Sequence, residues 1–284
     1  MRRSSFADGT PLITTKQEGG TAMENEIKTV KDYLMAILPY QQHAFAQVHR
    51  FGTKRPALLF RGQKTSQKLR AKIADFVATN EVDKQIAFER ARLDLLHERL
   101  KVNDKWNLIA LAQHHGIATR FLDWTSNSLT ALWFSLGSGR TPYSESGKSE
   151  VYLLETVDSD FDDPQNEESP IPEQKGSKTI IFTPSTLMDQ RVIVQDSYMM
   201  RQIYEYINLD NDRRLVIRTV DTNPTFKNRL YRIPITEDER TRSLLLGELA
   251  KYGYEYNRII PDSNDWEVLK KECDDLVKDF RKEK

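Results

Sequence analysis

An arginine at the end of a short apolar run is the first residue whose surroundings suggest chemistry. The run of residues 57–60 lies between Pro56 and Gly62, and its length and flanking residues predict a buried strand rather than a helix. Arg61 follows, and its guanidinium offers a rigid fork of donors that suits phosphate or carboxylate. Gly62 allows a sharp turn or a close approach of the backbone to a ligand. The segment is therefore a candidate anion-binding site.

The chain around Arg61 is strongly basic. From Lys54 to Ala74 it has seven basic residues and no acidic one: Lys54, Arg55, Arg61, Lys64, Lys68, Arg70 and Lys72. A solvated basic face, or an arginine paired with a buried carboxylate, would explain the same residues without any ligand. Both interpretations are open from the sequence.

A second segment, residues 113–134, mixes polar and apolar side chains over a short distance. Several polar residues surround a predicted extended piece and two predicted helix ends: His114, His115, Arg120, Asp123 and Thr125. Polar groups near a core need partners, so the segment is either an internal hydrogen-bonded knot, with Asp123 paired to Arg120 or Arg61, or a site. Adjacent residues of a helix point about 100° apart, and no third ligand follows the histidines at a useful spacing. We therefore expect no metal there.

Hydrophobic spacing predicts the elements that must position these residues. Helices are expected at residues 29–50, 85–101, 104–115, 237–252 and from Ser263 onward, with one more that begins after Ser126 or Asn127 and ends at Gly137. Strands are expected at residues 57–60, from 121, and at 151–154, 179–182, 191–195, 215–220 and 230–235. Helices dominate the first half and strands the second, which predicts an α+β fold. Residues 1–24 are interpreted as a flexible leader, and residues 25–284 as one domain with a C-terminal helix.

Composition argues against several classes of protein. Lys and Arg total 42, as do Asp and Glu, so a general nucleic-acid or membrane-surface binder is not expected. Cys273 is the only cysteine, which excludes a disulfide framework and a cysteine-rich zinc site. No apolar stretch approaches the ~18 residues of a membrane span, and no apolar segment follows the basic N-terminus. We expect a cytoplasmic protein with no membrane partner and with a solvated acidic loop at residues 158–173.

Two motifs resemble those of the FRG domain family, which is named for the triplet Phe60-Arg61-Gly62. The second is Gln-His-His-Gly-x-x-Thr-Arg-x-Leu-Asp-Trp-Thr at residues 113–125, and the likeness continues to Phe134. Residues 191–195 resemble the family's Arg-Ile-x-x-Gln element, and residues 260–262 resemble its terminal Phe-Pro-Asp. The resemblance thus extends over about residues 30–265. Its departures are small: Ala118 replaces a frequent proline, Phe121 a frequent leucine, and residues 196–198 differ from the glycine and phenylalanine usual there.

The resemblance implies a function in conflict between bacteria and phages. Members of the family resemble components of such systems, which implies a toxin or antiphage defence protein with a cognate antitoxin or defence-system partner. The order of the motifs is also similar to that of ADP-ribosyltransferases. This second likeness implies a mainly antiparallel, ADP-ribosyltransferase-like mixed sheet core, with the helical N-terminal half packed on it. NAD would then be the substrate, and the acceptor, a protein or a nucleic acid, is not specified.

The same likeness assigns roles to particular residues. It implies catalytic residues at Arg61, Asp123, Thr125 and Gln195. Further contacts with NAD are implied for Phe60, Gly62, Gln63, His115, Arg120, Trp124, Ser126 and Tyr198, with Trp124 or Tyr198 stacked on nicotinamide. An amide cannot serve as a base, so Glu205, Glu248 and Asp262 are alternatives to Gln195.

Two other classes of function compete with an enzyme. The basic residues and the neighbouring aromatics also suit a non-catalytic module that binds a nucleotide or a nucleic acid. The second competing class is an interaction scaffold that binds a partner through the terminal helix and the acidic loop. An enzyme predicts that Arg61, Asp123, Thr125 and Gln195 line one pocket, whereas a nucleic-acid binder predicts a continuous exposed basic groove.

Overall fold

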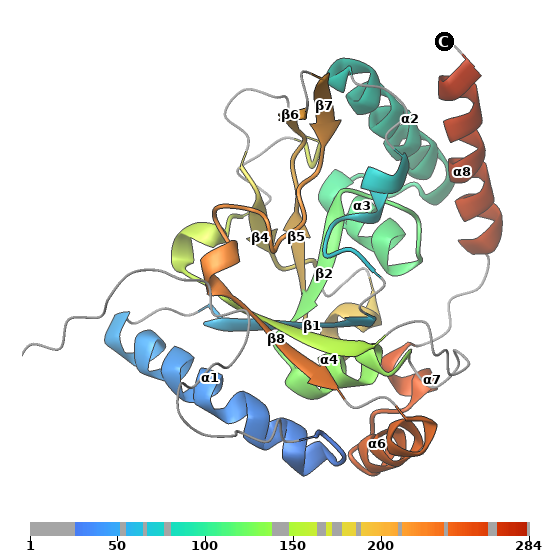
Figure 1. The fold of residues 1–284 in the computed structure, drawn as a ribbon. Coiled ribbons are helices and arrows are strands. Elements are labelled where there is room, and N and C mark those ends of the chain that lie inside the picture. Colours follow the sequence, from blue (N-terminus) through green and yellow to red (C-terminus); the bar gives the residue numbers. More distant parts are fainter. Residues whose placement is uncertain are drawn as a thin grey trace, which may run out of the picture.

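Six strands form one twisted, open sheet in which all paired neighbours are antiparallel (Figure 1). In spatial order they are β4 (Ile180–Phe182), β5 (Ser197–Arg201), β2 (Phe121–Thr125), β1 (Leu58–Lys64), β3 (Ser149–Glu155) and β8 (Leu230–Ile235). The strands β6 (Glu205–Leu209) and β7 (Asp212–Val216) form a separate hairpin. This computed structural model describes residues 26–51, 55–64, 67–76, 81–137, 148–163, 169–171, 178–185, 189–209, 212–235, 238–260 and 266–282.

The two central strands of the sheet diverge. β1 pairs with β3 along its whole length, from Leu58 opposite Glu155 to Lys64 opposite Ser149. It pairs with β2 at a single position, Phe60 opposite Thr125. Beyond Phe60 the strands separate, and β1, β3 and β8 cross the direction of β2 and β5 steeply (Figure 1). At this separation, which we call the wedge, residues 61–64 line a pocket.

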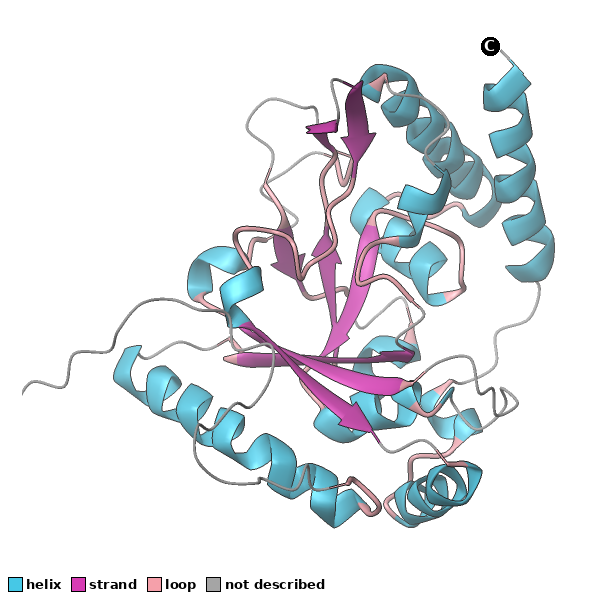
Figure 2. Ribbon diagram, in the orientation of Figure 1, coloured by secondary structure: helices cyan, strands magenta, loops and turns pink. Residues whose placement is uncertain are grey.

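Helices cover the two halves of the sheet separately (Figure 2). One core cluster joins β1, β3 and β8 to α1 (Val30–Phe51), α4 (Ser128–Ser135), α6 (Glu239–Lys251) and α7 (Tyr256–Ile259). Another joins β2, β4 and β5 to α2 (Val82–Leu100), α3 (Lys105–His114) and α8 (Trp266–Lys282). The described residues also include α5 (Gln190–Val194) and short 3-10 turns at Lys72–Phe76, Asp158–Asp160 and Lys227–Arg229. No helix of the described ranges is both long and apolar enough to cross a membrane.

Local signals placed the helix ends around the second motif correctly. Asp104 caps α3 by accepting the backbone N–H groups of Trp106 and Asn107, and Asn127 caps α4 in the same way. Gly116 and Gly137 follow these helices at φ +80° and +73°, a conformation that glycine adopts without strain. The prediction of both helices is confirmed. The first helix, α1, continues through Pro39 without a break.

Residues 191–195 are not a strand, and this prediction was wrong. They lie in α5 and its C-terminal cap, because Asp189 accepts the N–H of Arg191 and starts a helical turn despite the β-branched residues that follow. The strand that pairs with β2 is instead β5, which was not predicted. The strand expected at residues 215–220 is β7, which ends at Val216 and pairs with β6.

The acidic segment is only partly a solvated loop. Asp160 is buried, and both of its carboxylate oxygens accept hydrogen bonds from Arg229, at 2.6 and 2.9 Å. Phe161 and Ile171 are also buried. The segment therefore anchors itself to the sheet through an ion pair and two apolar side chains. Residues 164–168 and 172–173, the leader 1–24 and Asp262 lie outside the described residues.

The expected fold class is confirmed in its coarse form. The chain combines helices with a mainly antiparallel sheet, and the one parallel contact between the described strands is an isolated bridge from Phe161 to Ile181. The division into a helical half and a strand half is too simple, because the central strands β1 and β2 come from the first half.

Gly62 is required by helix packing. A Cβ built at this position would overlap the carbonyl oxygen of Ala131 and would lie 2.6 Å from the backbone nitrogen of Ser135. Both atoms belong to α4, which crosses directly over β1. Gly62 of the Phe60-Arg61-Gly62 triplet thus lets the backbone of α4 pack closely against β1. The sequence had suggested a sharp turn or a close approach to a ligand instead.

We expect Gly62→Ala to lower the free energy of unfolding by about 1–3 kcal/mol, because β1 and α4 must move apart to admit the methyl group. Gly247→Ala is the matched control. Gly247 lies on α6 with nothing within 4 Å of its added Cβ, so we expect a gain of about 0.5–1 kcal/mol from helix propensity. Urea unfolding measures both, and equal midpoints for Gly62→Ala and the wild-type chain would contradict the packing argument.

Candidate functional site

The wedge between β1 and β2 opens into a pocket of about 570 Å³. Its walls are the end of β1, the C-terminal end of α3, residues 123–125 of β2, α4, and the turn after α5. The volume is within the ~300–1,000 Å³ range of small-molecule sites. Arg61, Asp123, Thr125 and Gln195 all line this pocket, so their predicted convergence is confirmed.

Arg61 reaches across the wedge from β1 to β2. Its Nη1 donates to the backbone carbonyl of Asp123 at 2.5 Å, and its Nε donates to Oε1 of Gln63 at 3.1 Å. The carboxylate oxygen Oδ2 of Asp123 is 4.0 Å from Nη1. Burial lowers the pKa of the guanidinium and Asp123 partly opposes this, but an arginine stays charged at neutral pH. A partly buried cation with its counter-ion 4.0 Å away favours the binding of an anion.

Asp123 is held by a chain of hydrogen bonds. The Thr119 hydroxyl donates to Oε1 of Gln113 at 2.6 Å, which turns the Gln113 amide N–H toward Oδ2 of Asp123 at 2.9 Å. The Asp123 side chain is 40% exposed, yet its Oδ1 is enclosed and has no hydrogen-bond partner among the described residues. Among the described residues that line the pocket, Asp123 is the only carboxylate. It is therefore fixed in place, with one enclosed oxygen that has no partner among the described residues.

Thr125 and Gln195 line the pocket mainly as parts of its wall. The Thr125 hydroxyl donates to the carbonyl of Gln195 at 2.5 Å and accepts the N–H of Asn127 at 2.9 Å. The Gln195 amide donates to the carbonyl of Ile259 at 2.9 Å. These bonds join β2, α5 and α7, so both side chains are largely committed to the protein.

The expected NAD contacts on β1 also reach the pocket. Phe60, Gly62 and Gln63 line it, although Phe60 is buried with α4 and Gly62 is covered by that helix. Gln63 accepts from Arg61 and donates to the carbonyl of Gln67 at 3.0 Å. Gln63 therefore helps to orient the guanidinium.

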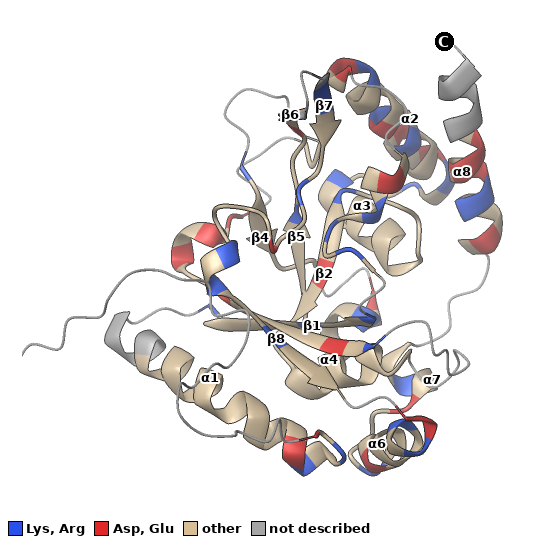
Figure 3. Cartoon of the chain, in the orientation of Figure 1, with Lys and Arg blue, Asp and Glu red and all other residues tan. Residues whose placement is uncertain are grey.

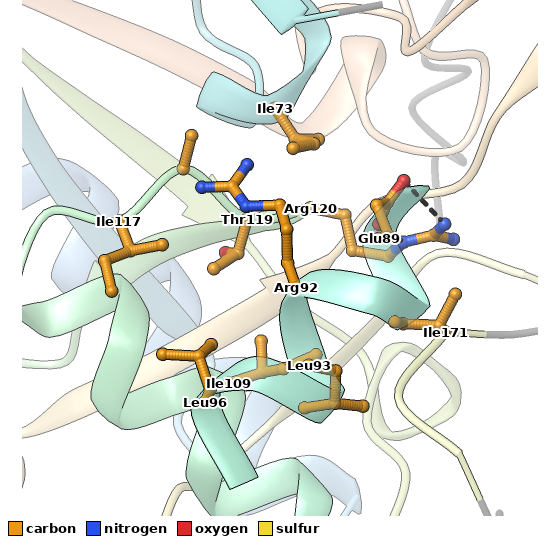
Figure 4. A pocket seen from close by; sticks show the side chains of 11 residues that line it. Ile73, Glu89, Arg92, Leu93, Leu96, Ile109, Ile117, Thr119, Arg120 and Ile171 are labelled. Carbon is orange, nitrogen blue, oxygen red and sulfur yellow. Dashed lines mark hydrogen bonds and ion pairs between the residues drawn. The ribbon is translucent and has the colours of Figure 1, made fainter. Parts of the chain in front are cut away.

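Arg120 lies away from this pocket, contrary to expectation. It is 2% exposed and forms a two-pronged ion pair with Glu89 of α2, at 2.7 and 3.0 Å (Figure 4). Its guanidinium also lies 5.1 Å from the centre of the Tyr204 ring. Arg120 borders a separate, much smaller cavity between α2 and α3, together with Arg92 (Figure 4). Its role is to join α2 to β2.

His115 is also outside the pocket. Its ring stacks on Trp266 of α8 with centroids 4.0 Å apart, and its Nε2 lies 3.7 Å from Oδ2 of Asp189. Burial and the nearby Arg191 lower its pKa to about 4, against the opposing effect of Asp189. The neutral imidazole therefore serves as a packing surface for α8.

Three other expected contacts with NAD are not presented to the pocket. Ser126 and Tyr198 are not among the residues that line it. Trp124 borders it but is 2% exposed, because alternate residues of β2 face opposite sides of the sheet. Trp124 and Tyr198 are cross-strand neighbours and pack in the core on the side opposite Asp123 and Thr125. Neither is placed to stack on nicotinamide.

Several lining residues were missed from the sequence. Gln113 and His114 belong to the second motif, but no role at the site was predicted for them. Arg191 was named only as part of a motif, and Lys64 only as part of the basic stretch. Against one carboxylate, the described lining residues include three permanent cations: Arg61, Lys64 and Arg191. Elsewhere positive and negative side chains alternate, as on α2, α6 and α8 (Figure 3). The pocket is therefore locally positive within a neutral chain.

Most of the residues that line this pocket lie in a segment that matches a known family. Residues 56–143 match the family model of the FRG domain. The chain contains an FRG domain. The match includes β1, β2, α3 and α4, and with them Arg61, Gln113, His114 and Asp123. No curated protein and no solved structure matches the chain significantly.

The folded unit extends beyond the matched FRG residues. The match contains the two central strands of the sheet, whereas β3, β4, β5 and β8, which pair around them, follow it in the sequence. Two of the alternatives for a catalytic acid, Glu205 and Glu248, also follow it and do not line the pocket, whereas Asp262 lies outside the described residues. Glu205 pairs with Arg218 at 2.6 Å, and Glu248 accepts the N–H of Val30 at 2.7 Å.

The lowered pKa of His115 predicts a pH dependence of stability. The unfolded chain binds a proton at the ordinary histidine pKa of about 6.5, while the folded chain does so only at about 4. Between these values the unfolded state holds more protons, so stability falls as the pH is lowered through this window. We expect the wild-type chain to lose more stability than His115→Gln between about pH 7 and about pH 5.

The matched control is His43→Gln, because His43 is exposed and pairs with Glu155 on the surface. It should retain the wild-type pH dependence. Urea unfolding at both pH values gives the comparison, and parallel losses in wild type and His115→Gln would exclude a buried neutral His115.

Proposed function

We propose that the pocket binds NAD and cleaves its bond between nicotinamide and ribose, either to transfer ADP-ribose to an acceptor or to consume NAD. The observation that carries this proposal is the placement of the Arg61 and Asp123 side chains in one pocket, on the two sides of the wedge. One is a desolvated cation and the other a carboxylate with an unpartnered oxygen, and both line the same pocket. The resemblance in motif order to ADP-ribosyltransferases agrees with this reaction.

The charge of the pocket suits the substrate. NAD has a pyrophosphate, and the cations among the lining residues are Arg61, Lys64 and Arg191. A guanidinium can hold phosphate oxygens with two parallel hydrogen bonds. The pocket volume of about 570 Å³ is ample for a dinucleotide that leaves part of its surface exposed.

Asp123 supplies the charge that the reaction needs. As nicotinamide departs, positive charge develops on the ribose, and a fixed carboxylate beside it stabilises that charge without reorganisation. Gln113 and Arg61 hold the residue on both its side chain and its backbone. We assign Arg61 to the pyrophosphate and Asp123 to the ribose cation.

The test is incubation of the purified protein with NAD labelled in its nicotinamide group, with and without cell extract. We expect wild type to release nicotinamide. Arg61→Ala should bind NAD about tenfold or more weakly, since it loses charge-assisted hydrogen bonds. Arg55→Ala is the matched control, because Arg55 belongs to the same basic stretch but contacts Phe161 and the carbonyl of Asp158 away from the pocket.

The outcomes separate the competing functions. Binding of NAD without release of nicotinamide would favour a non-catalytic nucleotide-binding module, and the absence of both would refute the proposal. An active enzyme from a conflict system should also slow growth when it is expressed, and Arg61→Ala should relieve that effect.

A further inference from the structure

A histidine and an aspartate form a second polar pair beside the same pocket. His114 is the last residue of α3, and its side chain is 4% exposed. Its Nδ1 lies 3.3 Å from Oδ2 of Asp189, which precedes α5. Its Nε2 is buried and has no hydrogen-bond partner among the described residues. His114 lines the pocket together with Asp123, so one ring nitrogen is committed and the other is unused.

Asp189 is firmly fixed. Its Oδ1 accepts the N–H of Arg191 at 2.8 Å, while its Oδ2 faces His114 and, at 3.7 Å, Nε2 of His115. Burial raises the pKa of this carboxyl, but the hydrogen bonds from His114 and from the Arg191 backbone outweigh burial and lower it. An ionised carboxylate at Nδ1 keeps the imidazole proton there and leaves the lone pair on Nε2.

The pocket has other unsatisfied polar atoms. The Thr130 hydroxyl is fully buried, and neither it nor Oδ1 of Asp123 has a hydrogen-bond partner within the described ranges. Both residues line the same pocket as His114. Buried polar groups in native proteins are normally paired, so the unpaired atoms of His114, Asp123 and Thr130 at one pocket point to a polar ligand that completes them.

We infer that His114, positioned by Asp189, is the general base that activates the acceptor, and that the acceptor is a neutral hydroxyl group. This inference rests on the proposed NAD cleavage. The acceptor oxygen forms a bond to C1′ of the ribose, and the bond from C1′ to the nicotinamide nitrogen breaks. Its electron pair neutralises the pyridinium, and the hydroxyl proton passes to Nε2 of His114. A carboxylate acceptor has no proton to give up and would not need this base.

The charged groups around His114 fit this role. Arg191 donates to its backbone carbonyl at 2.6 Å, and Asp123 is tied to its neighbour Gln113. His115, which also faces Asp189, has a pKa lowered to about 4 and is neutral near pH 7. His114 is thus the imidazole that borders the pocket, and Asp189 is its positioning residue.

The experiment compares His114→Gln and Asp189→Asn with wild type for nicotinamide release in single turnover. Asparagine keeps the helix cap at residue 189, so the second variant changes the dyad without removing α5. We expect release to slow by about 10²–10⁴-fold in His114→Gln, with unchanged affinity for NAD. The decline of the wild-type rate in acid should disappear in that variant. His43→Gln, on the surface, should behave as wild type.

The product and the ring nitrogens provide independent readouts. A hydroxyl acceptor gives free ADP-ribose if it is water, or a conjugate stable to neutral hydroxylamine if it is an alcohol. Nitrogen NMR should find Nε2 of His114 unprotonated in wild type and altered in Asp189→Asn. Equal rates in wild type and His114→Gln, a hydroxylamine-labile conjugate, or a proton on Nε2 would overturn the inference while NAD cleavage stands. A wild-type protein that releases no nicotinamide removes both proposals.

Discussion

Asp123→Asn is expected to slow NAD cleavage by about 10²–10³-fold with little change in NAD affinity. Asparagine has the same shape and its oxygen can still accept from Gln113, so the pocket should keep its form. The negative charge that stabilises the ribose cation is lost, and that charge matters only in the transition state. The loss should therefore appear in kcat and not in the dissociation constant, which single-turnover kinetics and direct binding measure separately.

Asp83→Asn is the matched control for this change. Asp83 is exposed in the first turn of α2, and it does not line the pocket. We expect the wild-type rate there. A wild-type rate in Asp123→Asn as well would show that the chemistry does not depend on the only carboxylate among the described lining residues.

Glu89→Ala is expected to lower the free energy of unfolding by about 3–5 kcal/mol, because it leaves the buried guanidinium of Arg120 without its counter-ion. Arg120 is 2% exposed, and water cannot replace the lost carboxylate. The double replacement Glu89→Leu with Arg120→Met should recover much of the loss, since it removes both charges. Urea or thermal unfolding measures these differences.

An exposed pair provides the control for the buried one. Arg99 of α2 and Glu272 of α8 form a similar two-pronged contact, at 3.1 and 3.0 Å, but the Arg99 side chain is 56% exposed. Glu272→Ala should cost about 1 kcal/mol or less. If both alanine variants lost the same stability, burial would not be the cause of the large effect.

The helices near the site could be predicted because their signals are local. Asp104, Gly116, Asn127 and Gly137 each act on backbone groups within a few residues, so the sequence alone places the ends of α3 and α4. The prediction of a strand at residues 191–195 was wrong for the opposite reason. Their β-branched composition favours a strand, and the capping by Asp189 together with packing against the sheet prevailed.

The site was predicted in part. Arg61 and Asp123 were correctly expected to line one pocket, but the pairing of their strands, β1 and β2, was not predicted. His115 was chosen where His114 borders the pocket, since adjacent helix residues point in different directions and the sequence does not say which one faces inward. Arg120 was expected at the ligand from the resemblance. Its actual partner, Glu89, lies 31 residues earlier on α2, and sequence spacing does not reveal that contact.

The sequence by itself determined which residues belong to the FRG motifs, the bounds of most helices, and a basic segment hidden in a neutral total charge. Only the tertiary structure decided what each polar residue does. The divergence of β1 from β2 creates the pocket, and the crossing of α4 explains Gly62. Partner choice among buried charges is settled by contacts between distant segments. A buried charge must have a partner because it has lost its water, but the spacing of residues in the sequence does not show which partner it will have.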